Sequence, residues 1–312
     1  RGAIGSAVST DLTNWTIGPP LLSPGSTYAP ECPEIFELDG RRYLVYSTYS
    51  DRFATRHRIW DDRASAWIRP DADALESNDV YAMSTVSDGE RRYLVGWLST
   101  RSGDSDTGHR QWGGDLVAHE LRSRPDGTLG AHPIDTVIGR YDTQPAALEP
   151  HNGTWTVDGG DATFEGTDFG WASAGEVGEQ ALLDVTVHLD GSAEEIGIAV
   201  RASSDFRSAY LLRFEPSRGR VVFDRRPHRI DVPFDMDSDR SYVSAADHEL
   251  ERSIDTSGPI RCRIMVEGSA IVAYIGDVAL TTRGYDLDGG AFGLYSAGGR
   301  ARFSGARVGT LR

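Results

Sequence analysis

The sequence contains no lysine. All 32 basic residues are arginine, against 47 acidic residues, which gives a net charge of −15. Duplex nucleic acids and anionic membranes both favour basic surfaces, so neither is an expected partner, whereas a neutral substrate is compatible with this charge. No apolar run approaches the ~20 residues of a membrane-spanning helix. The first residues, 1–5, lack the basic and apolar pattern of a signal peptide, and the compartment is left open.

Cysteine is also scarce. Cys32 and Cys262 are too few for a disulfide framework and lack the C-x-x-C spacing of a zinc site, so two free thiols are predicted. His57, His109 and His119 are not spaced as metal ligands on one element, and His119 is expected to be structural. There is no phosphate-binding glycine loop and no G-x-S-x-G elbow. No metal ion or cofactor is therefore predicted.

Glycine, aromatic and β-branched residues are plentiful, and they favour β structure. Residues 34–48 and 80–98 repeat one pattern, in which two strand-like runs flank an Asp-Gly turn. A repeat of ~40–50 residues built from short antiparallel strands indicates β-propeller blades. A propeller closes with ~4–8 blades, but residues 1–140 supply two and part of a third. The sequence therefore predicts an incomplete propeller that a missing N-terminal segment or a partner chain would complete.

The pattern changes after residue 140. Residues 141–155 are interpreted as a linker, and residues 156–312 as a β-sandwich built from short alternating strands. The expected strands are residues 181–189, 195–202, 209–215, 220–225, 260–267, 270–275, 291–296 and 301–308. The strand at 260–267 alternates Arg261, Cys262 and Arg263, so Cys262 is predicted to point inward. The fold class is all-β: a partial propeller followed by a sandwich.

Glu31 is the leading candidate for chemistry. Pro30 and Pro33 bracket it and Cys32 at the start of a strand, where a propeller loop faces the central channel. A carboxyl group in such a desolvated place can stay protonated, as glycoside cleavage requires of its general acid. The alternative is an ordinary solvated loop acid, and the residues alone leave both interpretations open.

Several short motifs follow one another in order, at residues 7–15, 31–36, 78–82, 96–97, 110–121 and 126–133. The first two contain the patterns "S-x-D-L-x-N-W" and "E-C-P-x-x-F", and later ones contain "D-x-Y-A", "G-W" and "W-G-G-x-L … E-L". Together they resemble the corresponding stretches of glycoside hydrolase family 32, the β-fructofuranosidases (invertases, inulinases and levanases). The resemblance thus extends through about residue 135.

The resemblance implies a five-bladed propeller followed by a β-sandwich, and retaining hydrolysis of β-fructofuranosides such as sucrose or fructans. Glu31 would be the general acid/base. The nucleophile would be a second carboxylate ~5–5.5 Å away. In the family this is an Asp from a "W-M-N-D-P-N-G" segment on the first blade, and an "R-D-P" segment on the second blade supplies a third acid. The sequence contains neither segment, so the nucleophile is expected from outside this chain, together with roughly the first two blades.

Four further residues are candidates for substrate binding. Cys32 lies beside the acid; Trp97 and Trp112 could stack on a furanose ring or fill the core. Asp79 could hold a sugar hydroxyl or cap a turn.

Tyr49 and Arg52 are weaker candidates for the rim. Residues 104–106 and 235–239 are similar to parts of a calcium loop, but the second lacks the required Gly and Glu, and both are predicted to be solvated turns.

Two alternatives to a β-fructosidase are kept. The chain could belong to an arabinan- or xylan-active glycosidase with a five-bladed propeller, or to a carbohydrate-binding protein without turnover.

Overall fold

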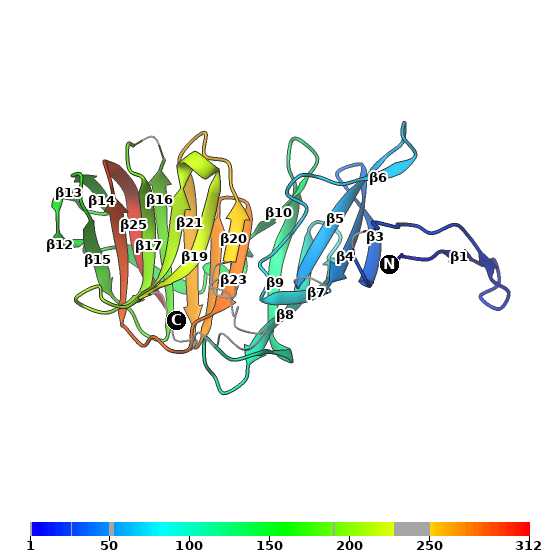
Figure 1. The fold of residues 1–312 in the computed structure, drawn as a ribbon, viewed down its shortest axis with the longest axis horizontal. Helices are drawn as coiled ribbons and strands as arrows, with labels where there is room; N and C mark the ends of the chain where they lie inside the picture. The colour runs from blue at the N-terminus through cyan, green and yellow to red at the C-terminus, as the bar shows by residue number, and fades with distance from the viewer. Residues whose placement is uncertain (1, 26, 50–52, 190, 228–249) are drawn as a thin grey trace, which may run out of the picture. The chain divides into compact units, whose positions relative to one another are not determined.

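A computed structural model of the chain describes residues 2–25, 27–49, 53–189, 191–227 and 250–312. Nearly all of its regular structure is β, as predicted (Figure 1). Within these ranges the helices are the four-residue α1 (Asp135–Ile138) and a 3₁₀ turn at Pro216–Arg218. None of the described helices is long and apolar enough to cross a membrane. The chain divides into two compact units, Arg1–Thr100 with Arg110–His132, and Arg101–His109 with Pro133–Arg312.

The first unit contains two antiparallel four-stranded sheets, each a meander of the kind that forms a propeller blade. One sheet has the order β3-β4-β5-β6 and the other the order β10-β9-β8-β7, and β7 packs against β3, β4 and β5. The strands are β3 (Pro30–Leu38), β4 (Arg41–Thr48), β5 (Ala54–Asp61), β6 (Ala66–Ile68), β7 (Val80–Ser87), β8 (Arg92–Arg101), β9 (Arg110–Ser123) and β10 (Leu129–His132).

The predicted Asp-Gly hairpin is confirmed between β3 and β4. Leu38 pairs with Arg41, so Asp39 and Gly40 form a two-residue loop, and both have positive φ (51° and 71°). That conformation matches the right-handed twist of the flanking strands, which explains why Asp-Gly is found there.

Buried polar contacts join the two sheets. The backbone N–H of Leu129 in β10 donates to Nε2 of His57 in β5 at 3.3 Å, and Nδ1 of His57 lies 3.0 Å from the carbonyl oxygen of Asp73. Because Nε2 accepts, the proton of this neutral ring is on Nδ1, which donates to Asp73. His119 is likewise buried, with its Nε2 3.1 Å from Oε1 of Glu76, which confirms the prediction that His119 is a structural residue.

A two-stranded arm, β1 (Ala7–Val8) with β2 (Thr16–Ile17), precedes these sheets. Large apolar side chains on it are open to solvent, including Val8 at 68% and Ile17 at 87% exposure. Large apolar side chains exposed in this way are typical of segments that pack against other polypeptide.

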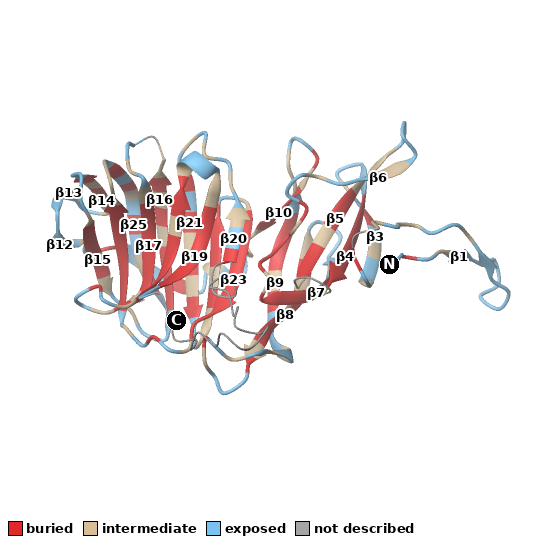
Figure 2. Cartoon of the chain, viewed as in Figure 1, coloured by how far each residue is buried: buried red, intermediate tan, exposed pale blue. Residues whose placement is uncertain are grey.

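The second unit is a β-sandwich (Figure 1). Its first sheet contains β11 (Tyr141–Pro145), β13 (Thr154–Asp158), β14 (Asp161–Glu165), β16 (Gln180–His188), β21 (Ile260–Glu267), β22 (Ala270–Ile275), β23 (Val278–Arg283) and β25 (Ala301–Leu311). Its second sheet contains β12 (Glu149–Asn152), β15 (Gly170–Glu176), β17 (Glu195–Ala202), β18 (Ala209–Glu215), β19 (Arg220–Arg226), β20 (Leu250–Ser253) and β24 (Ala291–Ala297). Figure 2 shows the buried strands of this unit.

Alternate residues of both sheets form one hydrophobic core, as the period of two predicts. Leu183 and Ile264 from the first sheet meet Ile198 and Phe214 from the second. Cys262 is fully buried in this core, as predicted, and its burial raises the pKa of the thiol far above its usual range.

The structure differs from the linker prediction for residues 141–155. That segment forms β11, β12 and the start of β13, and the second unit already begins at Pro133 rather than beyond residue 140. β12 is an edge strand paired with β15, and β11 pairs with β25. Edge strands tolerate proline and need no apolar alternation, so Pro145 and Pro150 made this segment resemble a loop.

Candidate active site

Glu31 lies in the second position of β3, where the strand is distorted by a bulge. Glu31 pairs with Ser47 of β4 but the next paired residue is Glu34, which faces Val45. Cys32, within the bulge, has φ of 49°, a left-handed conformation that costs ~1 kcal/mol or more for a residue with a Cβ. Such strain persists where the surrounding structure fixes it, and it is concentrated at functional sites.

The same distortion occurs at the equivalent place in the second sheet. Tyr81 of β7 pairs with Trp97 of β8, the next paired residue is Ser84, and Ala82 within the bulge has φ of 52°. The internal repeat predicted from the sequence therefore extends to the bulge, with Tyr81 standing where the other sheet has Glu31.

These two residues are in contact. The hydroxyl of Tyr81 donates to Oε2 of Glu31 at 2.6 Å, while Tyr81 is only 2% exposed and Glu31 is half-buried. Desolvation of the phenol, followed by its hydrogen bond to Glu31, raises the pKa of Tyr81 far above its usual range. The hydroxyl therefore remains a donor at any working pH.

Aromatic rings surround Tyr81. Its ring centroid lies 4.6 Å from Phe53, 5.8 Å from Trp97 and 5.5 Å from Trp112. Trp112 also approaches Tyr49 at 6.0 Å and Phe53 at 5.2 Å. Trp97 is half-buried, whereas Trp112 is 69% exposed and presents its indole to solvent. We call these five residues the aromatic cluster; it brings both predicted tryptophans together beside Glu31.

The two glycines after Trp112 allow β9 to lie against β8. A Cβ on Gly114 would stand 1.7 Å from the carbonyl oxygen of Leu98, and Gly113 has φ of 148°. Any side chain at Gly114 would displace β9, so the "W-G-G" segment sets the position of Trp112.

Asp79 lies in a buried ion pair. It is 1% exposed, and its Oδ1 accepts from Nε of Arg110 in β9 at 2.5 Å. This contact holds Arg110 at the start of β9, while the contact of Asp79 with a sugar hydroxyl stays a prediction. The sequence could not show the ion pair, because Arg110 is 31 residues away.

Cys32 is exposed and adjacent to Glu31. Partial desolvation and then the negative charge of Glu31 raise the pKa of its thiol, so Cys32 is mainly in the uncharged form at neutral pH. It offers the site a small, weakly polar surface rather than a nucleophile.

The acids closest in sequence to Glu31 and Tyr81 are already engaged. Oε2 and Oε1 of Glu34 accept from the backbone N–H and the hydroxyl of Thr85, both at 2.6 Å, and Asp79 is paired with Arg110. Neither is available as the second carboxylate of a retaining glycosidase. Glu31 is therefore an acid/base candidate whose nucleophile is not supplied by its neighbours in β3 and β7.

Tyr81 and Phe53 were missed as site residues. Tyr81 lies in the recognised "D-x-Y-A" segment, but aligning the two repeats on their Asp-Gly turns places Val80 opposite Glu31, so only the matching bulges show that Tyr81 is its equivalent. Phe53 has no such signal. Arg52 and residues 235–239 lie outside the described residues.

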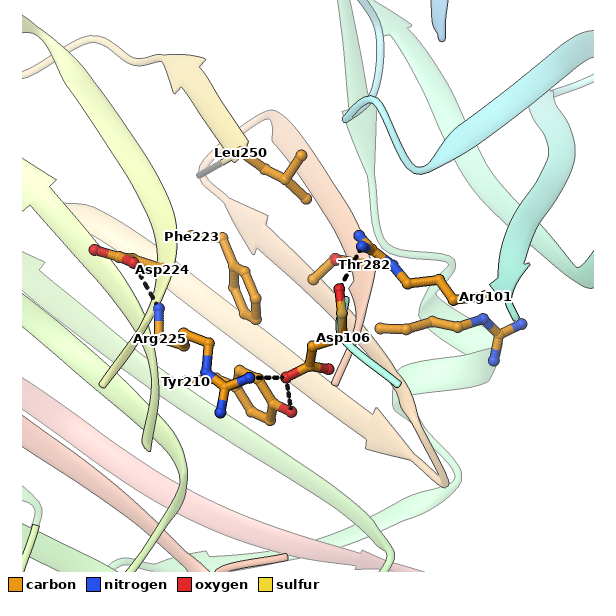
Figure 3. A pocket seen from close by; sticks show the side chains of 9 residues that line it. Arg101, Asp106, Tyr210, Phe223, Asp224, Arg225, Leu250 and Thr282 are labelled. Carbon is orange, nitrogen blue, oxygen red and sulfur yellow. Dashed lines mark hydrogen bonds and ion pairs between the residues drawn. The ribbon is translucent and has the colours of Figure 1, made fainter. Parts of the chain in front are cut away.

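A polar pocket in the second unit does not resemble a substrate site (Figure 3). Its volume is about 20 Å³, and Asp106 lies in it with Oδ2 2.8 Å from both the Tyr210 hydroxyl and a guanidinium nitrogen of Arg225. The prediction of a solvated turn at 104–106 is thus wrong for Asp106, which is only 4% exposed, whereas Asp104 is exposed. These bonds attach residues 101–109 to β18 and β19 of the second unit. Among the described residues, no group of three or more His, Cys, Asp or Glu side chains could hold a metal ion.

Blade-type sheets, a β-sandwich and a carboxyl group beside aromatic rings together define a glycosidase-type chain. Residues 2–133 match the N-terminal domain of glycosyl hydrolases family 32, and residues 152–309 match the family's C-terminal domain. The chain belongs to glycosyl hydrolases family 32.

Individual relatives agree with this assignment. A sucrose-6-phosphate hydrolase of Vibrio alginolyticus is 26% identical over 152 residues, covering 43% of this chain and 31% of that protein. An exo-inulinase from Aspergillus awamori superposes with a TM-score of 0.68 at 15% identity, covering 99% of this chain and 62% of that one. A fructan 1-exohydrolase from Cichorium intybus gives 0.66 at 16% identity, covering 99% and 67%. The chain therefore spans less than two thirds of the first two relatives, and the structural likeness supports the predicted propeller-and-sandwich fold.

Proposed function

We propose that this chain is the part of a retaining β-fructofuranosidase that carries the general acid/base, Glu31. The observation that supports this most directly is the half-buried carboxyl group of Glu31, hydrogen-bonded to Tyr81 beside the aromatic cluster. Family membership indicates the substrate class, because the relatives named above include an inulinase and a fructan exohydrolase. The substrate is a β-fructofuranoside, either sucrose or a fructan.

In the first step Glu31 gives its proton to the glycosidic oxygen as the bond from that oxygen to the fructosyl carbon breaks. The nucleophile's carboxylate oxygen forms the new bond to that carbon. In the second step Glu31, now ionised, takes a proton from water. The oxygen of that water displaces the carboxylate, and fructose leaves with its original anomeric configuration.

The nucleophile comes from polypeptide outside this chain, either an N-terminal segment of the same protein or a partner chain. The β1–β2 arm supports this, because its side chains Val8 and Ile17 are exposed as if they pack against further blades. The chain spans 62% of the length of the exo-inulinase, which leaves room for that segment.

Trp112 and Trp97 supply the apolar surface. The apolar C–H face of a furanose packs on an exposed indole, and Trp112 presents one beside Glu31. The net charge of −15 suits a neutral ligand better than a polyanion.

The test is Glu31→Gln in the complete protein, including the polypeptide that supplies the nucleophile. We expect hydrolysis of sucrose, inulin or levan to fall by ~10²–10⁴-fold, because the amide cannot transfer a proton. The matched control is Glu37→Gln, the same change on the exposed side of β3, where Glu37 only faces Arg42 at 3.6 Å. Both variants should unfold at the same temperature as the parent.

The same assay separates the alternatives. Hydrolysis of arabinan or xylan with no action on fructosides would identify the other propeller glycosidases. Calorimetric binding of a fructan without release of reducing sugar would identify a binding protein. Near-parental activity of Glu31→Gln would remove Glu31 from the mechanism.

A further inference from the structure

Two hydrogen-bonded contacts connect β3 of one sheet with β7 of the other. Tyr81 of β7 donates to Glu31 of β3, and Thr85 of β7 donates to Glu34 of β3 through both its backbone N–H and its hydroxyl. Arg92 of β8 lies 3.6 Å from Glu34 and donates to the Thr85 hydroxyl. The Glu34–Thr85 contact is thus part of a charged cluster, whereas in the Glu31–Tyr81 contact one uncharged donor faces the acid.

The Tyr81 hydroxyl is in a fixed position. The ring is 2% exposed and is held by Phe53 and Trp97, with centroids at 4.6 and 5.8 Å. The bulge at Ala82 fixes the backbone beside it, and the bulge at Cys32 does the same for Glu31. The Tyr81 ring cannot turn away without repacking the aromatic cluster.

The direction of this hydrogen bond distinguishes the two carboxyl oxygens of Glu31. The phenol is the donor, so Oε2 must accept, whether Glu31 is ionised or protonated. In the protonated acid the oxygen that accepts is the carbonyl oxygen, and the hydroxyl proton is on the other one. The proton that leaves Glu31 is therefore the one on Oε1.

We propose that Tyr81 is a positioning residue for the acid/base: its hydroxyl holds Oε2 of Glu31 and thereby keeps the transferable proton on Oε1, turned away from β7. The inference rests on the proposed function of Glu31. As the proton passes from Oε1 to the glycosidic oxygen, Glu31 becomes a carboxylate. The hydrogen bond from Tyr81 then becomes charge-assisted, and it is stronger to the developing carboxylate than to the neutral acid. Tyr81 therefore stabilises the transition state more than the starting acid.

The test compares Tyr81→Phe with the parent in the complete protein, using two substrates with different leaving groups. Sucrose releases a poor leaving group that needs the proton, whereas β-fructofuranosyl fluoride releases fluoride, which needs it far less. We expect kcat/KM for sucrose to fall ~10–100-fold, as for a misplaced catalytic group. For the fluoride, kcat/KM should change by less than about threefold. It reports only the first step, in which fluoride leaves with little need of a proton from Glu31.

Thr85→Val is the matched control. It removes a hydroxyl from the same strand and weakens the Glu34–Thr85 contact between the same two strands, but it leaves Glu31 and Tyr81 untouched. We expect it to lower thermal stability while leaving the ratio of the two kcat/KM values at the parental one. If Tyr81 has only a structural role, Tyr81→Phe will lower kcat/KM for sucrose and for the fluoride by the same factor, so that their ratio stays at the parental value. That result would overturn the inference.

The outcomes also separate the inference from the proposed function. If the parent hydrolyses sucrose and Glu31→Gln does not, but Tyr81→Phe keeps the parental ratio of the two kcat/KM values, the positioning role is wrong and the function stands. If the parent acts on neither fructoside, both are wrong.

Discussion

His57 should make the stability of the first unit depend on pH in the mildly acidic range. Its ring is fully buried between the two sheets, with Nε2 accepting from Leu129 and Nδ1 donating to Asp73. Protonation would place a second proton on Nε2, opposite an N–H group, and would charge a buried ring. Burial, the largest cause, accordingly lowers the pKa of His57 from 6.5 to about 4.

The sign follows from which state takes up the proton first. As the pH falls below 6.5, the unfolded chain protonates this histidine while the folded one does not, so the free energy of unfolding decreases. The loss begins near pH 6.5 and is complete below about pH 4. A difference of about 2.5 pKa units corresponds to about 3 kcal/mol in full. Between pH 7.5 and 5.5 the loss is about 1.4 kcal/mol, and at pH 4.5 it reaches about 2.5 kcal/mol.

The assay is urea unfolding at pH 7.5, 6.5, 5.5 and 4.5, followed by tryptophan fluorescence, for the parent and for His57→Gln. The glutamine variant cannot take up the proton, so its stability should fall less, and the difference between the two curves isolates His57 from the carboxylates. An NMR titration of the ring should give a midpoint well below 5. A midpoint near 6.5, or identical pH dependence in the two proteins, would refute the reasoning.

Two further predictions concern neighbours of the acid. Cys32 should react slowly with iodoacetamide at pH 7.5 despite its exposure, because its raised pKa keeps it a thiol, and its rate should increase as the pH rises. Glu31→Gln should accelerate that reaction by removing the adjacent charge; an unchanged rate would show that the charge of Glu31 does not reach the sulfur. Asp79→Ala should lower the free energy of unfolding by about 2 kcal/mol, because it leaves Arg110 without its buried partner, whereas Glu37→Ala on the surface should cost under about 1 kcal/mol. Thermal unfolding of both variants measures the contrast, and equal losses would mean that the Asp79–Arg110 pair adds nothing.

Much of the fold could be predicted because apolar alternation and turn chemistry are local. β17, β18, β21 and β22 have the bounds expected from the sequence, and the Asp39-Gly40 hairpin follows from residues that tolerate positive φ. The strands between residues 141 and 155 could not be predicted, since their pairing partners lie far along the chain and their own residues are polar or proline. β23 was missed for another reason: its sequence VALTTR has an apolar half followed by a polar half instead of an alternation, although all six of its residues are buried.

The candidate site was predictable in its parts but not in its contacts. Glu31, Trp97 and Trp112 were recognised from short motifs, yet the hydrogen bond to Tyr81 spans fifty residues of sequence and depends on two bulges. Asp79 illustrates another case, in which a residue within a recognised motif has a partner inside the protein, Arg110. Nothing in the neighbouring residues of Asp79 distinguishes a carboxylate that faces a ligand from one that faces Arg110.

The hydrogen bond between Glu31 and Tyr81 joins residues from separate sheets, so neither sheet can form it alone. The contact therefore depends on how the two sheets pack against each other. Under the roles proposed for Glu31 and Tyr81, a substitution that separates the sheets would lower turnover while leaving every strand intact, and a variant with low activity need not be an unfolded one.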